Sequence, residues 1–305
     1  MKNTDGKILV YKLRKYSKWY VIYGNDKYGP YDYIKYLQFS PDGKTLAYEV
    51  KIDGKHYVIY GNDKYGPYDD IDDLQYHELD YLKFSPNDKT LVYIVKTDDK
   101  YYVIYGNDKY GPYDDIHYLK FSPDGKTLVY TVKIDGKHYV ISGNDKYGPY
   151  DDIDDLQFSP DGKTLAYVVK INRKHYVISG NDKYGPYNEI DELQFSPDGK
   201  TLVYKAKIKG KWYVISGNDK YGPYDDIGDF QFSPDGKTLV YKAKIDDKYY
   251  YYLISENYQY GPYDVIWNLQ FSPDGKTLEI SVQIYDGQYI YLFLILNNEG
   301  FYVGS

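Results

Sequence analysis

Hydrophobic and polar residues alternate along short segments of the chain, with the period of two that is typical of β-strands. In the segment 201–208, Leu202, Tyr204 and Ala206 fall on one face of an extended chain and two lysines fall on the other. The segment WYVISG (212–217) is rich in aromatic and β-branched residues. The turn sequences PDGK, KGK and GNDK separate such segments, and helical periodicity is absent from the sequence. This pattern predicts short antiparallel strands joined by tight turns.

The same pattern recurs along the whole chain. The motif FSPDGK, once written FSPNDK, has its Phe at Phe39, Phe84, Phe121, Phe158, Phe195, Phe232 and Phe271. Most intervals are 37 residues; one copy carries eight extra residues within 69–83, and another carries two near 256–259. The motif YGPY follows the same spacing. Four short strands in 37 residues is the size of one propeller blade, and stacked blades need apolar residues on both faces.

The number of copies predicts the number of blades. The turn between the first and second strands occurs eight times, whereas the first strand ending in FS occurs seven times. We therefore expect an all-β, closed β-propeller of four-stranded antiparallel blades, a single domain over residues 1–305, with eight blades and seven as the alternative. The C-terminal segment EGFYVGS is expected to form either the outer strand of its own blade or the missing inner strand of the first.

The repeated motifs also carry a family resemblance. FSPDGKTLAY, followed by a DGK turn and an aromatic strand, resembles the TolB-like, PD-type relatives of the WD-repeat propellers. The segment KHYVISGNDKYGPYDDI is similar to a bacterial subgroup of these repeats. The Gly-His and Trp-Asp pairs of WD repeats and the second domain of larger TolB-like proteins are missing from the sequence. The resemblance implies a propeller with a binding role and transfers no catalytic residue.

Composition narrows the function classes. Tyrosine accounts for 46 of 305 residues, and cysteine is absent, which excludes disulfides, thiolate metal sites and a cysteine nucleophile. The formal net charge of −7 argues against a general affinity for nucleic acid. The sequence has no apolar run that approaches a membrane span and no visible signal peptide. The compartment stays open between cytoplasm, periplasm and the extracellular space.

The five histidines are expected to be structural. His56, His138 and His175 share one repeat position, which other copies fill with Trp or Tyr. His77 and His117 lack a partner at motif spacing, and every serine that could act as a nucleophile belongs to the repeated FSP or ISG segments. We therefore expect no catalytic residues, no metal site and no cofactor, and hence no enzyme.

Carboxylates collect where the fourth strand of one blade passes to the first strand of the next. The candidate partner surface consists of Asp69, Asp70, Asp72, Asp73, Asp114, Asp115, Asp151, Asp152, Asp154, Asp155, Asp225 and Asp226. Repetition would gather them at one end of the channel, where mutual repulsion raises some pKa values. A cation or a basic partner is one interpretation, and a solvated acidic rim is the favoured one, since no segment matches a calcium-binding loop.

These observations favour a non-catalytic propeller that acts as a monomeric binding or scaffold module for a protein partner. The alternative is a propeller that binds carbohydrate or another small ligand on its repeated YGPY tyrosines, although these are expected mainly to pack between blades. An enzyme with a carboxylate or metal site at the channel mouth is the least favoured. The extra segment Tyr76–Lys83 is expected to protrude at the acidic end.

Overall fold

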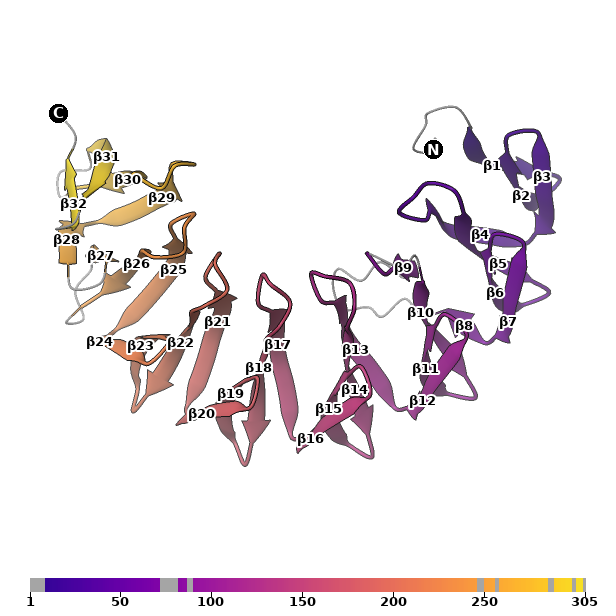
Figure 1. The fold of residues 1–305 in the computed structure, drawn as a ribbon, viewed down its shortest axis with the longest axis horizontal. Helices are drawn as coiled ribbons and strands as arrows, with labels where there is room; N and C mark the ends of the chain where they lie inside the picture. Colours follow the sequence, from indigo (N-terminus) through magenta and orange to yellow (C-terminus); the bar gives the residue numbers. More distant parts are fainter. Residues whose placement is uncertain are drawn as a thin grey trace. The chain divides into compact units, whose positions relative to one another are not determined.

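The described residues form antiparallel β-sheets that follow one another along the chain (Figure 1). The computed structural model describes residues 9–71, 82–86, 90–245, 250–255, 258–284, 288–297 and 300–303. These residues fall into two compact units, Met1–Pro149 and Tyr150–Ser305, and each is considered by itself. Among the described residues, no helix has the length and apolarity to cross a membrane.

The strands of the first half come from four repeats. They are β1 (Val10–Lys15), β2 (Lys18–Tyr23), β3 (Asp26–Tyr31), β4 (Tyr33–Phe39), β5 (Leu46–Ile52), β6 (Lys55–Tyr60), β7 (Asp63–Tyr68), β8 (Asp70–Ile71), β9 (Leu82–Phe84), β10 (Leu91–Thr97), β11 (Lys100–Tyr105), β12 (Asp108–Tyr113), β13 (Asp115–Phe121), β14 (Leu128–Ile134), β15 (Lys137–Ser142) and β16 (Asp145–Tyr150). The first sheet has the order β1-β2-β3 and the second β4-β5-β6-β7. In the third sheet, β10 pairs with both β8 and β9, so the inner strand is described in two pieces. The fourth sheet has the order β13-β14-β15-β16.

The strands of the second half form four regular sheets. They are β17 (Asp152–Phe158), β18 (Leu165–Ile171), β19 (Lys174–Ser179), β20 (Asp182–Tyr187), β21 (Glu189–Phe195), β22 (Leu202–Ile208), β23 (Lys211–Ser216), β24 (Asp219–Tyr224), β25 (Asp226–Phe232), β26 (Leu239–Lys244), β27 (Tyr251–Ser255), β28 (Tyr258–Tyr263), β29 (Val265–Phe271), β30 (Thr277–Gln283), β31 (Tyr289–Asn297) and β32 (Gly300–Val303). Within each sheet the strand order follows the sequence, which is the meander of a propeller blade.

The sheets confirm the all-β fold class and the number of repeats. Eight sheets are described, in agreement with the eight copies of the turn, so the alternative of seven is dropped. The C-terminal strand β32 pairs with β31 as the outer strand of its own sheet, the first of the two arrangements expected. Closure of the eight sheets into a ring stays a prediction.

A strand boundary lies inside the repeated segment YGPYDDI. The segment YGPYDDI is not one strand: β24 ends at Tyr224, and Asp226 already begins β25 of the next sheet. The chain changes sheets at Asp225, whose backbone N–H donates to the carbonyl of Lys244 at 2.9 Å. The repeat therefore crosses from one sheet to the next between its two adjacent aspartates.

The second strands that have a sheet on either side, β5, β10, β14, β18, β22 and β26, are buried on both faces. Tyr204 and Ala206 of β22 belong to a cluster with Val168 and Val177 of the preceding sheet. Val203 belongs to a different cluster, together with Tyr241 of the following sheet. The alternation along 201–208 thus divides the strand between two interfaces, because a sheet lies on either side of it.

A pair of tyrosines recurs between successive sheets. The second tyrosine of YGPY meets the second-strand tyrosine of the next sheet in an edge-to-face contact, with their hydroxyls close enough to hydrogen-bond. The pairs are Tyr31–Tyr48, Tyr68–Tyr93, Tyr113–Tyr130, Tyr150–Tyr167, Tyr187–Tyr204 and Tyr224–Tyr241. In the last pair the oxygens are 2.9 Å apart, and burial raises the pKa of Tyr241. These tyrosines pack between sheets, as expected from the sequence.

The glycine of YGPY permits a close approach to the neighbouring strand. Gly111 has φ +134°, and a Cβ placed there would lie 2.8 Å from the carbonyl oxygen of Tyr101 and 2.8 Å from Cδ1 of Tyr102. We expect Gly111→Ala to lower the free energy of unfolding by more than about 2 kcal/mol, because backbone strain adds to the steric clash. Urea denaturation followed by circular dichroism measures this change.

The matched control is Gly136→Ala in the turn between β14 and β15. Gly136 also has positive φ, +76°, but nothing lies within 4 Å of a Cβ placed there. This variant carries only the left-handed backbone cost of about 1–2 kcal/mol. Equal destabilisation by the two substitutions would show that the close approach at Gly111 is unimportant.

Candidate functional site

At four junctions the first carboxylate bonds to other groups of the chain, although it stays partly exposed to solvent. Asp114 accepts a hydrogen bond from Nζ of Lys100 in its own sheet at 2.5 Å, and another from the backbone N–H of Asp135 in the next sheet at 2.7 Å. Asp69 and Asp225 form the equivalent ion pairs with Lys55 and Lys211. Asp151 accepts the equivalent bond from the backbone N–H of Asn172 at 2.8 Å. This aspartate therefore fastens one sheet to the next.

These bonds correct the expected electrostatics of the junctions. The Lys55 and Lys100 ammonium groups, with a backbone N–H in each case, hold the pKa values of Asp69 and Asp114 below the usual aspartate value. The expected rise of some pKa values therefore does not extend to these two residues. The pKa of Asp154 is raised as expected, because this residue is partly buried and lies near the carboxylate of Asp152.

The remaining predicted carboxylates have local roles or stay exposed. Oδ1 of Asp70, Asp115 and Asp152 accepts the N–H of the following isoleucine at 2.9–3.0 Å. Asp155 accepts the N–H of Leu193 in the next sheet at 3.1 Å, and Asp226 is exposed on β25. Asp72, Asp73 and most of the extra segment 76–83 lie outside the described residues. In the described part of the chain, no group of three His, Asp or Glu side chains could hold a metal ion.

Several histidines, His117 and His175 among them, have partners that the sequence analysis missed, and His56 has a buried one. Nδ1 of the buried His56 lies 2.7 Å from Oε1 of Glu49, which is also buried. Burial raises the pKa of Glu49, and the hydrogen bond from His56 opposes this rise. Glu49 occupies a position where other repeats carry Ile94 or Thr131, and this single acidic copy was the available signal. His77 lies outside the described residues.

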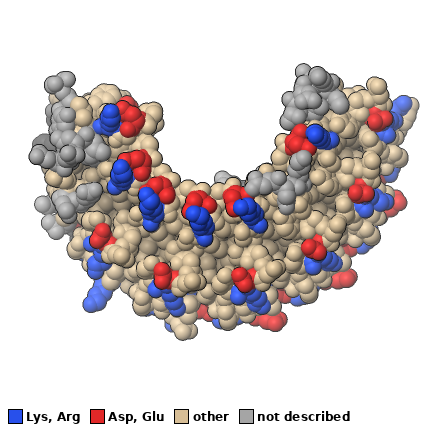
Figure 2. All heavy atoms as spheres, in the orientation of Figure 1, with Lys and Arg blue, Asp and Glu red and all other residues tan. Residues whose placement is uncertain are grey.

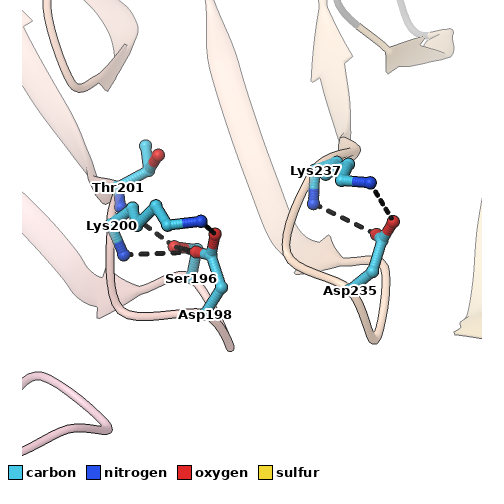
Figure 3. A network of polar contacts seen from close by, with 6 residues as sticks. All are labelled: Ser196, Asp198, Lys200, Thr201, Asp235 and Lys237. Atoms are coloured by element: carbon cyan, nitrogen blue, oxygen red, sulfur yellow. Dashed lines mark hydrogen bonds and ion pairs between the residues drawn. The ribbon is translucent and has the colours of Figure 1, made fainter.

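At the opposite end of the sheets, the FSPDGK turns form a repeated polar network (Figure 3). Oγ of Ser196 donates to Oδ1 of Asp198 at 2.7 Å and accepts the N–H of Thr201 at 3.0 Å. Nζ of Lys200 lies 3.0 Å from Oδ2 of Asp198. Ser233, Asp235 and Lys237 repeat the arrangement one sheet later. Acidic and basic side chains accordingly lie side by side at intervals along this face (Figure 2).

Two equivalent crevices open beside these turns in the second unit. One, of about 640 Å³, lies between the sheets of β19 and β22, and the other, of about 540 Å³, lies between those of β23 and β26. The same repeat positions line both crevices: Thr164, Ser179, Asn181, Asp182, Tyr184, Phe195, Lys200 and Tyr204 in one, and Thr201, Ser216, Asn218, Asp219, Tyr221, Phe232, Lys237 and Tyr241 in the other. Equivalent crevices therefore occur at two sheet boundaries at the turn end of this unit.

The crevices coincide with one difference between repeats, which Ser142 and the buried Ser255 also carry. In the first unit, the ring of Tyr105 packs 5.9 Å from that of Phe121 in the next sheet, and Tyr23 and Tyr60 make the same contact with their phenylalanines. Ser179 and Ser216 stand at this position in the second unit, where they line the crevices together with the buried Phe195 and Phe232. The change from VIY to VIS was visible in the sequence, but these serines were treated only as repeat serines.

Comparison with known proteins gives distant structural similarity. No protein-family model and no curated protein matches the chain. Solved structures similar to it include the Dos1 propeller, with 11% identity, a TM-score of 0.38 and coverage of 96% of this chain and 90% of that one. Oligogalacturonate lyase in complex with manganese has 13% identity, a TM-score of 0.35 and coverage of 96% and 97%. Dihydro-heme d1 dehydrogenase NirN in complex with DHE has 13% identity, a TM-score of 0.37 and coverage of 94% and 70%.

These similarities correct one expectation. We expected the chain not to be an enzyme, yet the similar structures include a lyase and a dehydrogenase. The prediction that enzymatic activity is excluded is therefore wrong, because a fold of this class is compatible with catalysis as well as with binding. The similar structures include a propeller and do not distinguish a TolB-like from a WD-repeat-like chain.

The turn network predicts a defined loss of stability in acid. Hydrogen bonds from Ser196 and Lys200 lower the pKa of Asp198 to about 2, whereas an aspartate in an unfolded chain titrates near pH 3.9. Because the folded value is the lower one, the stabilisation is complete above pH about 4 and is lost as the pH falls towards 2. We expect the melting temperature of Asp198→Asn to lie below that of the unaltered protein at pH 7, with the difference shrinking between about pH 4 and 2. A difference independent of pH in thermal unfolding would contradict this account.

Proposed function

We propose that this chain is a propeller-type binding module that holds an extended polypeptide partner in the crevices at its turn end. The observation that carries the proposal is the repetition of one crevice at consecutive sheet boundaries. Their volumes, about 640 and 540 Å³, lie within the range of roughly 300–1,000 Å³ for ligand pockets.

The lining of each crevice suits a peptide. Phe195 and Tyr204 are buried in the wall of the crevice, and the half-buried ring of Tyr184 offers the apolar surface onto which a side chain of the partner would pack. Asn181 offers an amide that can both donate to and accept from a peptide bond. Asp182 and Lys200 place both signs of charge in the lining, a combination that favours neither a polyanion nor a polycation.

Repetition adds to the binding of an extended partner. Once one part of the partner occupies the first crevice, the next part reaches the second crevice at a high effective concentration, so two weak contacts act as one stronger contact. Nothing in this argument needs the junction carboxylates, because those bonded to lysines and turn amides hold the fold together. We therefore propose a partner surface at the turn end instead of the acidic end.

A second candidate is carbohydrate binding, the alternative drawn from the repeated tyrosines. The first tyrosines of two YGPY motifs, Tyr184 and Tyr221, line the crevices and are half-buried. An aromatic ring at a polar crevice also suits a sugar, so the two candidates differ in what the open crevices accept.

Filling the crevices tests the proposal. We expect the double variant Ser179→Tyr and Ser216→Tyr to bind peptides selected on the unaltered protein at least about tenfold more weakly than that protein does. The new rings would occupy the position that Tyr105 fills in the first unit. Peptides are selected from a random library on the intact protein, and affinities are measured by biolayer interferometry. The melting temperature should stay the same or rise, since Tyr105 and Phe121 show that the ring fits.

The matched control keeps the crevices open. Ser179→Ala with Ser216→Ala removes the hydroxyls but adds no volume, and it should retain peptide binding within a few-fold. If no peptide is selected, or if the filled and open variants bind the selected peptides equally, the turn-end crevices are not the partner site. Binding on a glycan array that is lost on filling would support the carbohydrate alternative.

A further inference from the structure

A separate cavity lies in the second unit between the inner strands β25 and β29. It has a volume of about 250 Å³ and is lined by Asp229, Phe230, Gln231, Lys242, Ile266, Trp267, Asn268 and Leu269. None of these residues lines the turn-end crevices. The cavity is therefore a second candidate site, independent of the proposed function.

An indole side chain gives this cavity a rigid aromatic wall. Trp267 is 38% exposed and stacks on Tyr289, with ring centroids 5.5 Å apart and an angle of 27° between the rings. Other repeats carry Lys35, His117 or Asp154 at the position of Trp267. The indole is therefore a local departure from the repeat, which the shared packing of the sheets does not require.

The space is open because a lysine is drawn aside. One boundary earlier, Lys205 pairs with Glu192 and its Nζ lies 5.5 Å from the ring of Phe230 in the next sheet. Here Lys242 lies against Gly228: a Cβ on this glycine would fall 2.1 Å from Cε of Lys242. Its Nζ pairs with Asp229 at 3.3 Å.

Polar groups surround the indole. The carboxylate of Asp229 is exposed on 83% of its side chain and accepts from Lys242. Nδ2 of Asn268 donates to Oγ of Ser281 at 3.1 Å. Within the described residues, Oε1 of Gln231 is buried without a hydrogen-bond partner, and a buried acceptor of this kind calls for a donor. Carboxylate, ammonium and amide groups thus converge beside one aromatic ring.

We propose that this cavity binds one pyranose unit of a glycan. The apolar C–H face of the sugar ring would pack against Trp267, while its hydroxyls would hydrogen-bond with Asp229, Lys242 and Asn268. A hydroxyl both donates and accepts, which suits this mixed set of polar groups better than an anion or a cation would. A small turn of the Gln231 side chain would bring its oxygen to a sugar hydroxyl.

The intrinsic fluorescence of the protein provides the test. The chain has three tryptophans, so the double variant Trp19→Phe and Trp212→Phe leaves Trp267 as the sole reporter. This protein is titrated with a panel of methyl pyranosides and with oligosaccharides chosen from a glycan array. We expect a saturable fluorescence change with at least one sugar.

Three variants locate the binding in the otherwise unaltered protein, with affinities measured by calorimetry. Trp267→Ala should abolish sugar binding, and Asp229→Asn should weaken it about tenfold. Gly228→Ala should also weaken it, because the added methyl displaces Lys242 into the cavity. Trp212→Ala, in another sheet, is the control and should bind sugar normally.

The outcome is decisive even if Trp267→Ala fails to fold. Asp229 is largely exposed, so Asp229→Asn leaves the packing unchanged and decides the question alone. The proposal is overturned if no sugar changes the fluorescence of Trp267, or if sugar binding survives Asp229→Asn and Gly228→Ala unchanged. Loss of glycan binding in the Ser179 and Ser216 filled variant alone would assign the sugar to the crevices and also overturn it.

Discussion

The contact between two tyrosines of successive sheets is the interaction on which the repeated structure depends. A phenol ring is large and apolar, yet its hydroxyl must find a partner when it is buried. In pairs such as Tyr113–Tyr130, each hydroxyl supplies the partner of the other, with the oxygens 3.4 Å apart. The core between two sheets can therefore be built largely from tyrosine. The glycine of YGPY belongs to the same arrangement, since it lets the outer strand lie close to its neighbour.

At the junction end of the sheets, charged residues form further contacts between neighbouring sheets. Asp114 accepts from a lysine of its own sheet and from a turn amide of the next, so one side chain links two sheets outside their apolar interface. Asn188 keeps the turn contact in another copy, through the N–H of Lys209 at 3.2 Å. A row of acidic residues that looks like a binding surface in the sequence is thus partly internal structure. For this reason we place the partner at the other end.

Because the repeats are nearly identical, we look for functional sites at the few positions where they differ. Serine replaces tyrosine at positions 179 and 216, and a crevice lies beside each of these serines. Tryptophan at position 267 and glycine at 228 similarly alter one boundary without changing its strands. At the crevices the tyrosine pairs Tyr187–Tyr204 and Tyr224–Tyr241 still supply the packing. At the boundary of Trp267, Ile280 stands in place of the second tyrosine, and its apolar cluster with Leu253 and Leu278 supplies the packing.

The sequence by itself determined the strands, the turns and the number of sheets, because alternation, turn chemistry and a repeat of 37 residues are local properties. It also determined that the YGPY tyrosines pack between sheets. It could not show that Asp225 marks the crossing between sheets or that Glu49 meets His56. The serine crevices were also decided only by the tertiary structure: VIY and VIS read alike as strands, and whether a position is filled or empty depends on the ring that faces it from the next sheet.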